Sequence, residues 1–403
     1  MSSPRRFEMV EGASSKFWEV KVEGSTFTVT YGRIGTAGTA KATSCASPEA
    51  AQSEADKLVR EKTKKGYQEV GAAPTWRPPT VIPHLSHPDR FLNYRVTQFD
   101  PEGDPEEEGD DGSRTFPALR ELERRAFRVG LTYDDDDDDF ATRLQALAAD
   151  PRVGELRALV IGGWFTEYCE EGSCDEPTAL LERLAPKFTA LEGLFLGDIV
   201  QEEAEISWIY PSDFGPLVNA LPSLRTLVVR GGAGLRLQGL KHANLRSLTI
   251  QSGGLAREVV ADVLAAELPE LRELTLWLGA DDYGGDTTPA DFEALLAGGL
   301  FPKLEHLGLQ DSPNADALAV AVAKSPLLGR LKGLDLSMGT LGDEGGEALL
   351  ASPAVRGLLH LNLRYHYMCL PLAREFKHLG PHVDVSDRQE ADDEDDRYIE
   401  VSE

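Results

Sequence analysis

A leucine pattern that recurs eight times constrains this chain more than any other feature. The pattern is Leu-x-x-Leu-x-Leu, in which Ile or Val can replace the last Leu, and it begins at Leu156, Leu191, Leu224, Leu245, Leu271, Leu304, Leu331 and Leu358. Successive copies start 21 to 35 residues apart. A unit of this size cannot bury its own apolar side, so the copies are expected to stack on one another as a solenoid. Such a fold offers a long surface to a partner rather than an enclosed pocket.

A helical segment is expected after each of these strand-like copies. We expect helices at residues 140–148, 178–184, 257–268, 290–296, 315–323 and 345–350, a capping strand at 127–131 and a closing strand near Val383 and Val385. Repeats of ~27 residues that alternate strand and helix predict a parallel sheet inside a ring of helices. The expected fold class is therefore α/β, a horseshoe solenoid over residues 116–386 that follows a small α+β unit. The pattern resembles leucine-rich repeat proteins of the ribonuclease-inhibitor-like kind, and from Phe127 onward it resembles a bacterial leucine-rich repeat family.

Charge divides the chain into two unlike parts. The formal net charge is −27, but residues 1–79 hold 12 Lys and Arg against 9 Asp and Glu, a balance of +3. The remainder holds 29 basic and 59 acidic residues, a balance of −30. Only the first part is suited to approach an anion such as nucleic acid, and its small excess predicts few phosphate contacts.

The chain shows no sign of export or of insertion into a membrane. Its first residues lack the apolar core of a secretory signal, and no stretch reaches the ~18 apolar residues of a membrane helix. The four cysteines are too few and too scattered for a disulfide framework. We therefore expect a soluble, cytoplasmic protein.

The N-terminal region reads as three strands closed by a helix. Residues 17–22 and 26–31 alternate and are rich in β-branched and aromatic residues, and Glu23-Gly24-Ser25 forms the turn between them. Residues 39–45 predict a third strand. Ser47-Pro48 then opens a helix, because Ser caps free N–H groups and Pro suits the first helical position.

Three ordered blocks in this region carry a family resemblance. They are Lys16-Phe17-Trp18-Glu19-Val20, Tyr31-Gly32-Arg33-Ile34-Gly35-Thr36 and Glu61-Lys62-Thr63-Lys64-Lys65-Gly66-Tyr67. Residues 5–70, within a domain at 1–76, resemble the WGR domain. Tyr31 stands where the name-giving Trp is expected, so the indole N–H donor is lost.

The resemblance implies a nucleic-acid site. In nuclear ADP-ribosyltransferases this module binds DNA near strand ends. Here Arg33 would contact phosphate, Gly32 would permit close approach of the backbone, and Tyr31 would stack on a base or sugar. The full set of expected nucleic-acid-binding residues is Tyr31, Gly32, Arg33, Lys41, Lys62, Lys64 and Lys65. In the alternative, Tyr31 packs on the helix and Arg33 pairs with a nearby acid such as Glu19.

Two further segments have the composition of connectors. Residues 77–115 are rich in Pro and acid, and we interpret them as a partly ordered linker in which 90–99 has strand-like alternation and packs on the first repeat. Residues 387–403 hold nine acids and two arginines, which is typical of a disordered acidic tail.

Strand alternation predicts which residues face outward on the concave side of the solenoid. These expected protein-binding residues are Phe195, Arg230, Gln251, Glu273, Trp277, His306, Gln310, Asp335, His360, Asn362 and Arg364. An exposed Trp beside Arg, His and Gln is typical of a protein-binding surface, so Trp277 is the expected anchor. In the alternative, neighbouring loops cover Phe195 and Trp277.

Metal, cofactor and catalytic sites are not expected. Cys169 and Cys174, and the group His360, His366 and Cys369, do not have the paired spacing of a zinc site. The run of aspartates at 134–139 lacks the glycine and terminal Glu of a calcium loop and suits a helix start. No nucleophile elbow or phosphate loop is present.

Three hypotheses follow. The first is a non-catalytic scaffold or adaptor whose concave face binds a basic or mixed-charge protein. The second is a DNA-linked regulator whose WGR-like module binds nucleic-acid ends. An enzyme with an unrecognised site is the third and the least supported.

Overall fold

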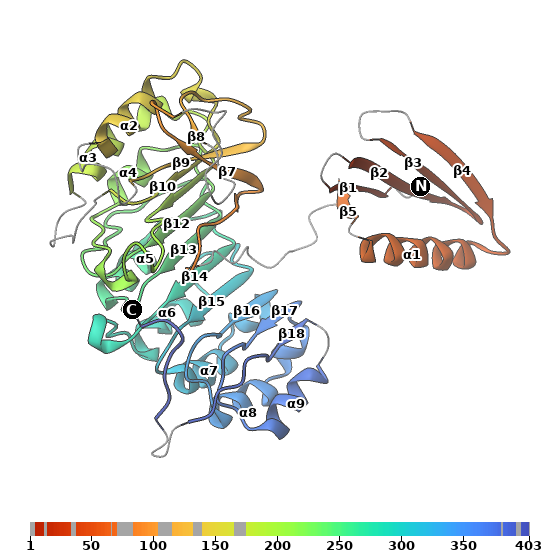
Figure 1. Ribbon diagram of the computed structural model, residues 1–403. Coiled ribbons are helices and arrows are strands. Elements are labelled where there is room, and N and C mark those ends of the chain that lie inside the picture. Colours follow the sequence, from red (N-terminus) through yellow and green to blue (C-terminus); the bar gives the residue numbers. More distant parts are fainter. Residues whose placement is uncertain are drawn as a thin grey trace. The chain divides into compact units, whose positions relative to one another are not determined.

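The computed structural model describes residues 5–11, 14–33, 38–65, 67–70, 84–103, 115–131, 139–164, 175–379, 382–391 and 396–402. The chain forms two compact units, residues 1–77 and 78–403 (Figure 1). The aspartate run at 134–138 and the pair Cys169 and Cys174 lie outside the described residues.

The N-terminal unit is a five-stranded antiparallel sheet with one helix. Its elements are β1 (Arg5–Glu11), β2 (Ser14–Glu23), β3 (Thr26–Arg33), β4 (Thr39–Ser44), α1 (Pro48–Lys64) and β5 (Gln68–Val70), in the sheet order β4-β3-β2-β1-β5. Helix α1 begins as predicted, because Ser47 accepts a hydrogen bond from the N–H of Ala50 at 3.2 Å. The prediction of three strands missed β1 and β5, which form one edge of the sheet.

One apolar core joins this sheet to its helix. Phe7, Trp18, Val20 and Phe27 from the strands pack with Ala51, Ala55 and Val59 from α1. The strand residues alternate along β2 and β3, and the helix residues are spaced by four, so both sets lie on single faces. This packing leaves the opposite face and the strand ends available for other contacts.

The large unit is built on one open sheet of 13 strands. Its strands are β6 (Arg90–Phe91), β7 (Tyr94–Phe99), β8 (Thr115–Phe116), β9 (Arg125–Val129), β10 (Ala158–Ile161), β11 (Gly193–Leu196), β12 (Thr226–Arg230), β13 (Ser247–Gln251), β14 (Glu273–Trp277), β15 (His306–Gln310), β16 (Gly333–Asp335), β17 (His360–Asn362) and β18 (Val383–Asp384). The order is β18-β17-β16-β15-β14-β13-β12-β11-β10-β9-β7-β6, with β8 beside β7. Neighbours are parallel except β6 and β7, so the chain has a large, mostly parallel sheet that does not close into a barrel.

Helices connect most of the successive strands and follow one another in chain order along the sheet (Figure 1). They are α2 (Asp139–Ala149), α3 (Asp175–Leu184), α4 (Gly215–Asn219), α5 (Arg257–Ala265), α6 (Glu293–Leu296), α7 (Ala315–Lys324), α8 (Asp343–Ala351) and α9 (Leu370–Lys377). Short 3-10 turns lie at Val153–Glu155, Ala185–Lys187, Ile206–Trp208, Asp281–Tyr283, Pro289–Phe292, Leu328–Arg330 and Pro353–Gly357. Helices α4 and α9 follow their strands as expected, although no bounds were predicted for them, and within the described residues no helix lies between β12 and β13.

The predicted ladder of leucines is confirmed. Adjacent strands align Leu159, Leu194, Leu227, Leu248, Leu274, Leu307, Leu334 and Leu361 as successive partners. All of them are buried in the main core with apolar residues of the connecting helices. Burial on this scale explains why the strand of each repeat is placed in register with the next.

The other face of the sheet is covered by two segments distant in sequence. Residues 84–99, which the sequence placed in a linker, add β6 and β7 to the sheet and bring Phe91 against Ala158, Val160, Phe195 and Val228. Gly193 permits this approach, since a Cβ there would lie 2.2 Å from a methyl group of Leu92. Residues 397–402 were expected to be disordered, but they pack on the strand ends and bury Val401.

Candidate nucleic-acid and protein interfaces

In the N-terminal unit a buried tryptophan lies beside an open tyrosine. Trp18 and Tyr31 are direct partners on β2 and β3, so their side chains point to the same side of the sheet. Trp18 is buried against Phe7, with ring centroids 5.4 Å apart, whereas Tyr31 is 49% exposed. Tyr31 is thus not packed away beneath α1, and its ring remains accessible for stacking.

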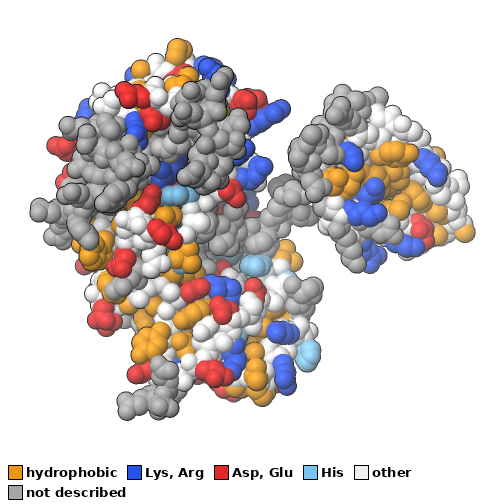
Figure 2. All heavy atoms as spheres, viewed as in Figure 1, with side chains coloured by type: hydrophobic (Ala, Val, Ile, Leu, Met, Phe, Trp, Pro, Cys, Tyr) orange, Lys and Arg blue, Asp and Glu red, His pale blue; other side chains and the backbone are white. Residues whose placement is uncertain are grey.

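Lysines of this unit lie over an aromatic ring or are open to solvent. The ammonium nitrogen of Lys62 lies 5.9 Å from the ring centroid of Trp18 and 5.0 Å from that of Tyr67, so it sits over two aromatic faces. Lys41 and Lys65 are exposed. Figure 2 shows Lys and Arg interleaved with hydrophobic side chains on one face of this unit.

Gly32 and Arg33 lie at the end of β3, opposite β2. Arg33 ends β3 and is the register partner of Lys16 on β2, which puts two cations at the same strand end. Gly32 lies between Tyr31 and Arg33 and pairs with Phe17. The side chains of Arg33 and Lys64 lie outside the described part of the structure.

The expected protein-binding face of the large unit is mostly buried, which corrects the sequence-based prediction. Seven of its residues are buried: Phe195, Arg230, Gln251, Trp277, His306, Gln310 and Asp335. Four are half-buried: Glu273, His360, Asn362 and Arg364. Alternation assigned the correct face of each strand, but it could not reveal that residues 84–99 and 397–402 cover that face.

Arg230 illustrates how these buried polar side chains form hydrogen bonds inside the protein. Its Nε donates to the side-chain oxygen of Gln251 at 3.0 Å, and its Nη1 donates to the carbonyl oxygen of Ile199 at 2.7 Å. Its guanidinium carbon lies 5.3 Å from the ring centroid of Phe195. Burial lowers the pKa of Arg230 to about 10, so the group stays charged at neutral pH.

A second buried charge, Asp198, lies at the end of β11 and was missed by sequence reasoning. Arg128 Nε donates to Asp198 Oδ2 at 2.8 Å, and His87 Nδ1 lies 3.1 Å from the same oxygen. His87 Nε2 lies 3.4 Å from a carboxylate oxygen of Glu203. Burial alone would lower the pKa of His87, but the hydrogen bonds to Asp198 and Glu203 outweigh it and raise the pKa to about 9. This ion cluster therefore fastens the segment 84–99 to the sheet.

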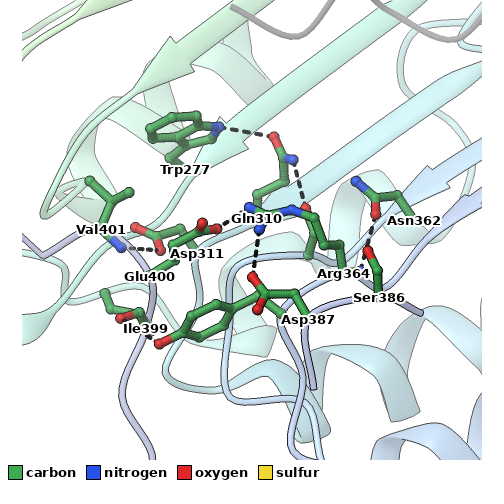
Figure 3. A network of polar contacts seen from close by, with 12 residues as sticks. Trp277, Gln310, Asp311, Asn362, Arg364, Ser386, Asp387, Ile399, Glu400 and Val401 are labelled. Carbon is green, nitrogen blue, oxygen red and sulfur yellow. Dashed lines mark hydrogen bonds and ion pairs between the residues drawn. The ribbon is translucent and has the colours of Figure 1, made fainter. Parts of the chain in front are cut away.

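A chain of hydrogen bonds starts at Trp277 and crosses four strands, and Figure 3 shows its first link, from Trp277 to Gln310. Trp277 Nε1 donates to Gln310 Oε1 at 2.9 Å, and Gln310 Nε2 donates to Ser337 Oγ at 2.9 Å. Ser337 Oγ donates to Asp335 Oδ1 at 2.6 Å, and Asn362 Nδ2 donates to Asp335 Oδ2 at 2.9 Å. The network joins Trp277, Gln310, Asp335 and Asn362, which the sequence analysis named as separate surface residues, through Ser337. These hydrogen bonds hold neighbouring strands of the sheet together.

Two segments cover Trp277 itself. The ring of His84 meets it edge-on, with centroids 5.5 Å apart. On another side it forms an apolar cluster with Ile206, Met338 and Val401. Only 4% of Trp277 is exposed, so the alternative in which loops cover this residue is the correct one.

The remaining polar residues of the face also show the effect of burial. Burial, with a smaller contribution from the charge of His360, lowers the pKa of His306 to about 3. Burial also raises the pKa of Glu273, and the nearby carboxylate of Glu305 adds to the rise. His306 is therefore neutral at physiological pH, because burial disfavours the charged imidazole.

The described residues contain neither a metal-binding cluster nor a membrane-spanning helix. No group of three or more His, Cys, Asp or Glu side chains there is arranged to hold a metal ion. None of the described helices combines the length and the apolar character that a membrane span needs.

Comparison with known proteins agrees with the two-part organisation. The WGR domain family matches residues 4–74. Over 65 residues the chain is 38% identical to the uncharacterized protein YfeS of Escherichia coli K12, a match that covers 16% of this chain and 27% of that protein. The chain thus spans about a quarter of that relative. A crystal structure of a Bacteroides fragilis protein is similar over 99% of both chains, with 30% identity and a TM-score of 0.65. The chain therefore carries a WGR domain at residues 4–74 and belongs, over its whole length, to one family with the Bacteroides fragilis protein.

Proposed function

We propose that this protein is a nucleic-acid-linked adaptor of the cytoplasm without catalytic activity of its own. The WGR domain, a member of a family of nucleic-acid-binding modules, contacts nucleic acid near strand ends. The large unit is a leucine-rich repeat solenoid that binds a protein. The open ring of Tyr31 beside exposed lysines is the observation that carries the nucleic-acid half.

The roles of the WGR residues follow from their chemistry. Tyr31 stacks on an unpaired base or sugar, because its ring is half exposed and lies on the same side of the sheet as the buried Trp18. Arg33, at the end of the same strand, contacts phosphate, and Lys41 and Lys65 extend the cationic surface. The excess of only three positive charges over residues 1–79 implies modest affinity and a shallow salt dependence.

The protein-binding half is supported by the repeated strand and helix units and by charge. The leucine ladder and the stacked helices are the arrangement from which leucine-rich repeat solenoids are built. A balance of −30 beyond residue 79 steers basic or mixed-charge partners toward this unit. Residues 84–99 and 397–402 cover the sheet face, so a partner first meets other parts of the unit.

The nucleic-acid half is tested by titrating nicked, blunt and single-stranded DNA with the full-length protein at several salt concentrations. We expect Tyr31→Ala to weaken binding by roughly 5- to 150-fold, the equivalent of ~1–3 kcal/mol for one stacked base. Arg33→Ala should lower the slope of affinity against salt by about one unit, because it removes one phosphate contact. Fluorescence anisotropy with labelled DNA measures both.

Arg124→Ala is the control, since this exposed cation lies in the other unit. It should leave the affinity and the slope unchanged. Absence of binding to all three DNAs at low salt would refute the nucleic-acid half, and equal binding to nicked and intact duplex would refute the preference for ends.

A further inference from the structure

The last residues of the chain lie in a groove at the ends of the large sheet. This C-terminal segment, residues 397–402, passes the loops that follow β17, β16, β15 and β13, so it crosses the repeats in reverse chain order. It forms no helix or strand. At its far end it reaches Gly253, where an added Cβ would lie 2.7 Å from the carbonyl oxygen of Ser402. The sheet thus holds an extended peptide.

One apolar side chain anchors the segment. Val401 is 3% exposed and packs with Ile206, Trp277 and Met338. Its neighbours are less enclosed, and Tyr398 is largely exposed. A single buried aliphatic residue within an otherwise open segment is typical of a peptide that binds reversibly.

Main-chain hydrogen bonds set the path of the segment (Figure 3). The N–H of Val401 donates to Asp311 Oδ1 at 3.0 Å, and the N–H of Glu400 donates to the carbonyl oxygen of Met338 at 2.9 Å. The hydroxyl of Tyr365 donates to the carbonyl oxygen of Ile399 at 3.4 Å. Contacts of this kind do not depend on side-chain identity, so any extended peptide can make them.

Side chains of opposite charge add selectivity. Arg364 pairs with Glu400 and, at 2.9 Å, with Asp387. Arg397 pairs with Asp316 at 3.0 Å, and it lines an open pocket with Asp316, Thr340 and Glu344. The groove therefore presents an acid, Asp316, to the basic Arg397 of the segment. It presents a base, Arg364, to the acidic Glu400 of the segment.

The groove is strained where it meets the segment. Asp311, Met338 and Tyr365 occupy equivalent positions after β15, β16 and β17, and all three have left-handed φ angles, 55°, 69° and 58°. Side chains other than glycine rarely adopt this conformation, and such residues cluster at binding sites. Asp311 is also fully buried, and its Oδ2 has no hydrogen-bond partner within the described residues. Burial raises its pKa well above the usual range. These features favour a binding site over optimal stability.

We propose that the groove formed by Ile206, Gly253, Trp277, Asp311, Met338 and Arg364 is a binding site for an extended segment of a partner protein. The matching segment carries a basic residue and, three and four positions later, an acidic and an aliphatic residue. The chain's own C-terminal segment occupies the site until such a partner displaces it. This inference rests on the protein-binding half of the proposed function and is independent of nucleic-acid binding.

The test uses a labelled peptide, Arg-Tyr-Ile-Glu-Val-Ser-Glu, and the full-length variant Val401→Asp. Placing a charge in the apolar cluster expels the tethered segment and opens the groove. The peptide should bind this variant at least ~10-fold more tightly than it binds the wild-type chain, because a tethered competitor acts at an effective concentration near millimolar. Val401→Ile keeps the apolar anchor and should behave as the wild type does.

Two further measurements check the chemistry of the site. A peptide with Asp in place of its Val should bind at least ~10-fold more weakly, as loss of an anchor predicts. Combined with Val401→Asp, Arg364→Glu should weaken binding of the original peptide, and a peptide with Lys in place of its first Glu should restore it. Restoration by charge reversal separates a direct contact from general damage to the fold.

Three outcomes would overturn the proposal. A folded Val401→Asp chain that does not bind the peptide shows that the groove is not a peptide site. Loss of cooperative unfolding in that variant shows that the segment is an integral part of the fold. A wild-type dimer that the substitution converts to a monomer shows that the segment is exchanged between two copies. DNA binding by the WGR domain is measured separately, so failure of one proposal does not obscure the other.

Discussion

Several residues whose type suggested a binding surface are instead buried and stabilise the fold. Trp277, Arg230 and His306 have the chemistry of contact residues, yet each is enclosed by parts of the chain far away in sequence. The polar atoms of Trp277 and Arg230 form hydrogen bonds inside the protein, to Gln310 in the first case and to Gln251 and Ile199 in the second. An unpaired polar group in such a site would be destabilising by ~1–3 kcal/mol, which accounts for the continuous networks around them.

Trp277→Ala should destabilise the large unit by ~3–5 kcal/mol, because it leaves a cavity and removes a hydrogen-bond donor to Gln310. This expectation differs from that of the sequence analysis, in which Trp277 is an exposed anchor. Urea unfolding measures the difference. Trp208→Ala is the matched control at a residue that is 46% exposed, and its effect should be less than half as large. Equal effects would contradict the burial argument.

His87 should make stability depend on pH, because its pKa is raised to about 9 in the folded protein from an ordinary value of 6.5. A raised pKa means that the folded state holds the proton more tightly, so the contribution is complete below pH 6.5. It then declines and is lost above pH 9. Relative to the wild type, His87→Gln should melt at a lower temperature at pH 6, and the two should converge by pH 9.5. His378→Gln, at an exposed position, is the control.

Among the elements, the strands of the repeats determine the regular arrangement of the large unit. Their leucines pair in one register from β10 to β17, and neighbouring helices pack on one another from α2 to α4 and from α7 to α9. Added strands extend this arrangement, since β7 joins β9 in parallel although it precedes the repeats in sequence. The sheet thus grows at its first edge from a segment whose composition is that of a linker.

Leu274→Ala should destabilise the large unit by ~2–5 kcal/mol, because the residue is fully buried in the middle of the ladder. The urea midpoint should fall while the slope of the unfolding free energy against urea stays constant. Leu359→Ala is the control, since this leucine is 56% exposed and adjoins the same kind of strand. It should change stability by less than ~0.5 kcal/mol. A large change in slope would indicate that the repeats unfold in parts.

The whole molecule consists of two compact units with separate hydrophobic cores and opposite charge balance. The first unit packs its sheet on a single helix, whereas the second buries a continuous core through all its repeats. Their sizes, 77 and 326 residues, differ about fourfold. Because each unit has its own core, each is expected to unfold on its own.

Calorimetry should therefore show two transitions, with enthalpies in a ratio of roughly one to four because unfolding enthalpy scales with chain length. Phe7→Ala should shift only the smaller transition, since Phe7 belongs to the first core. Leu274→Ala should shift only the larger one. A single transition moved by both substitutions would show that the units unfold as one.

Local patterns in the sequence determined the strands, the leucine ladder and the WGR resemblance. Strand alternation and helix spacing are set by backbone geometry, so Leu159 to Leu361 and the elements around Trp18 and Tyr31 could be identified from neighbouring residues alone. Alternation also assigned Trp277 and Phe195 to the correct face, but a face can be open or covered. Only the tertiary structure decided that Phe91 and Val401 cover it, and that Asp198 joins His87. These contacts link residues far apart in the chain, such as Trp277 and Val401, which are 124 positions apart, through single side chains that leave no periodic pattern in the sequence.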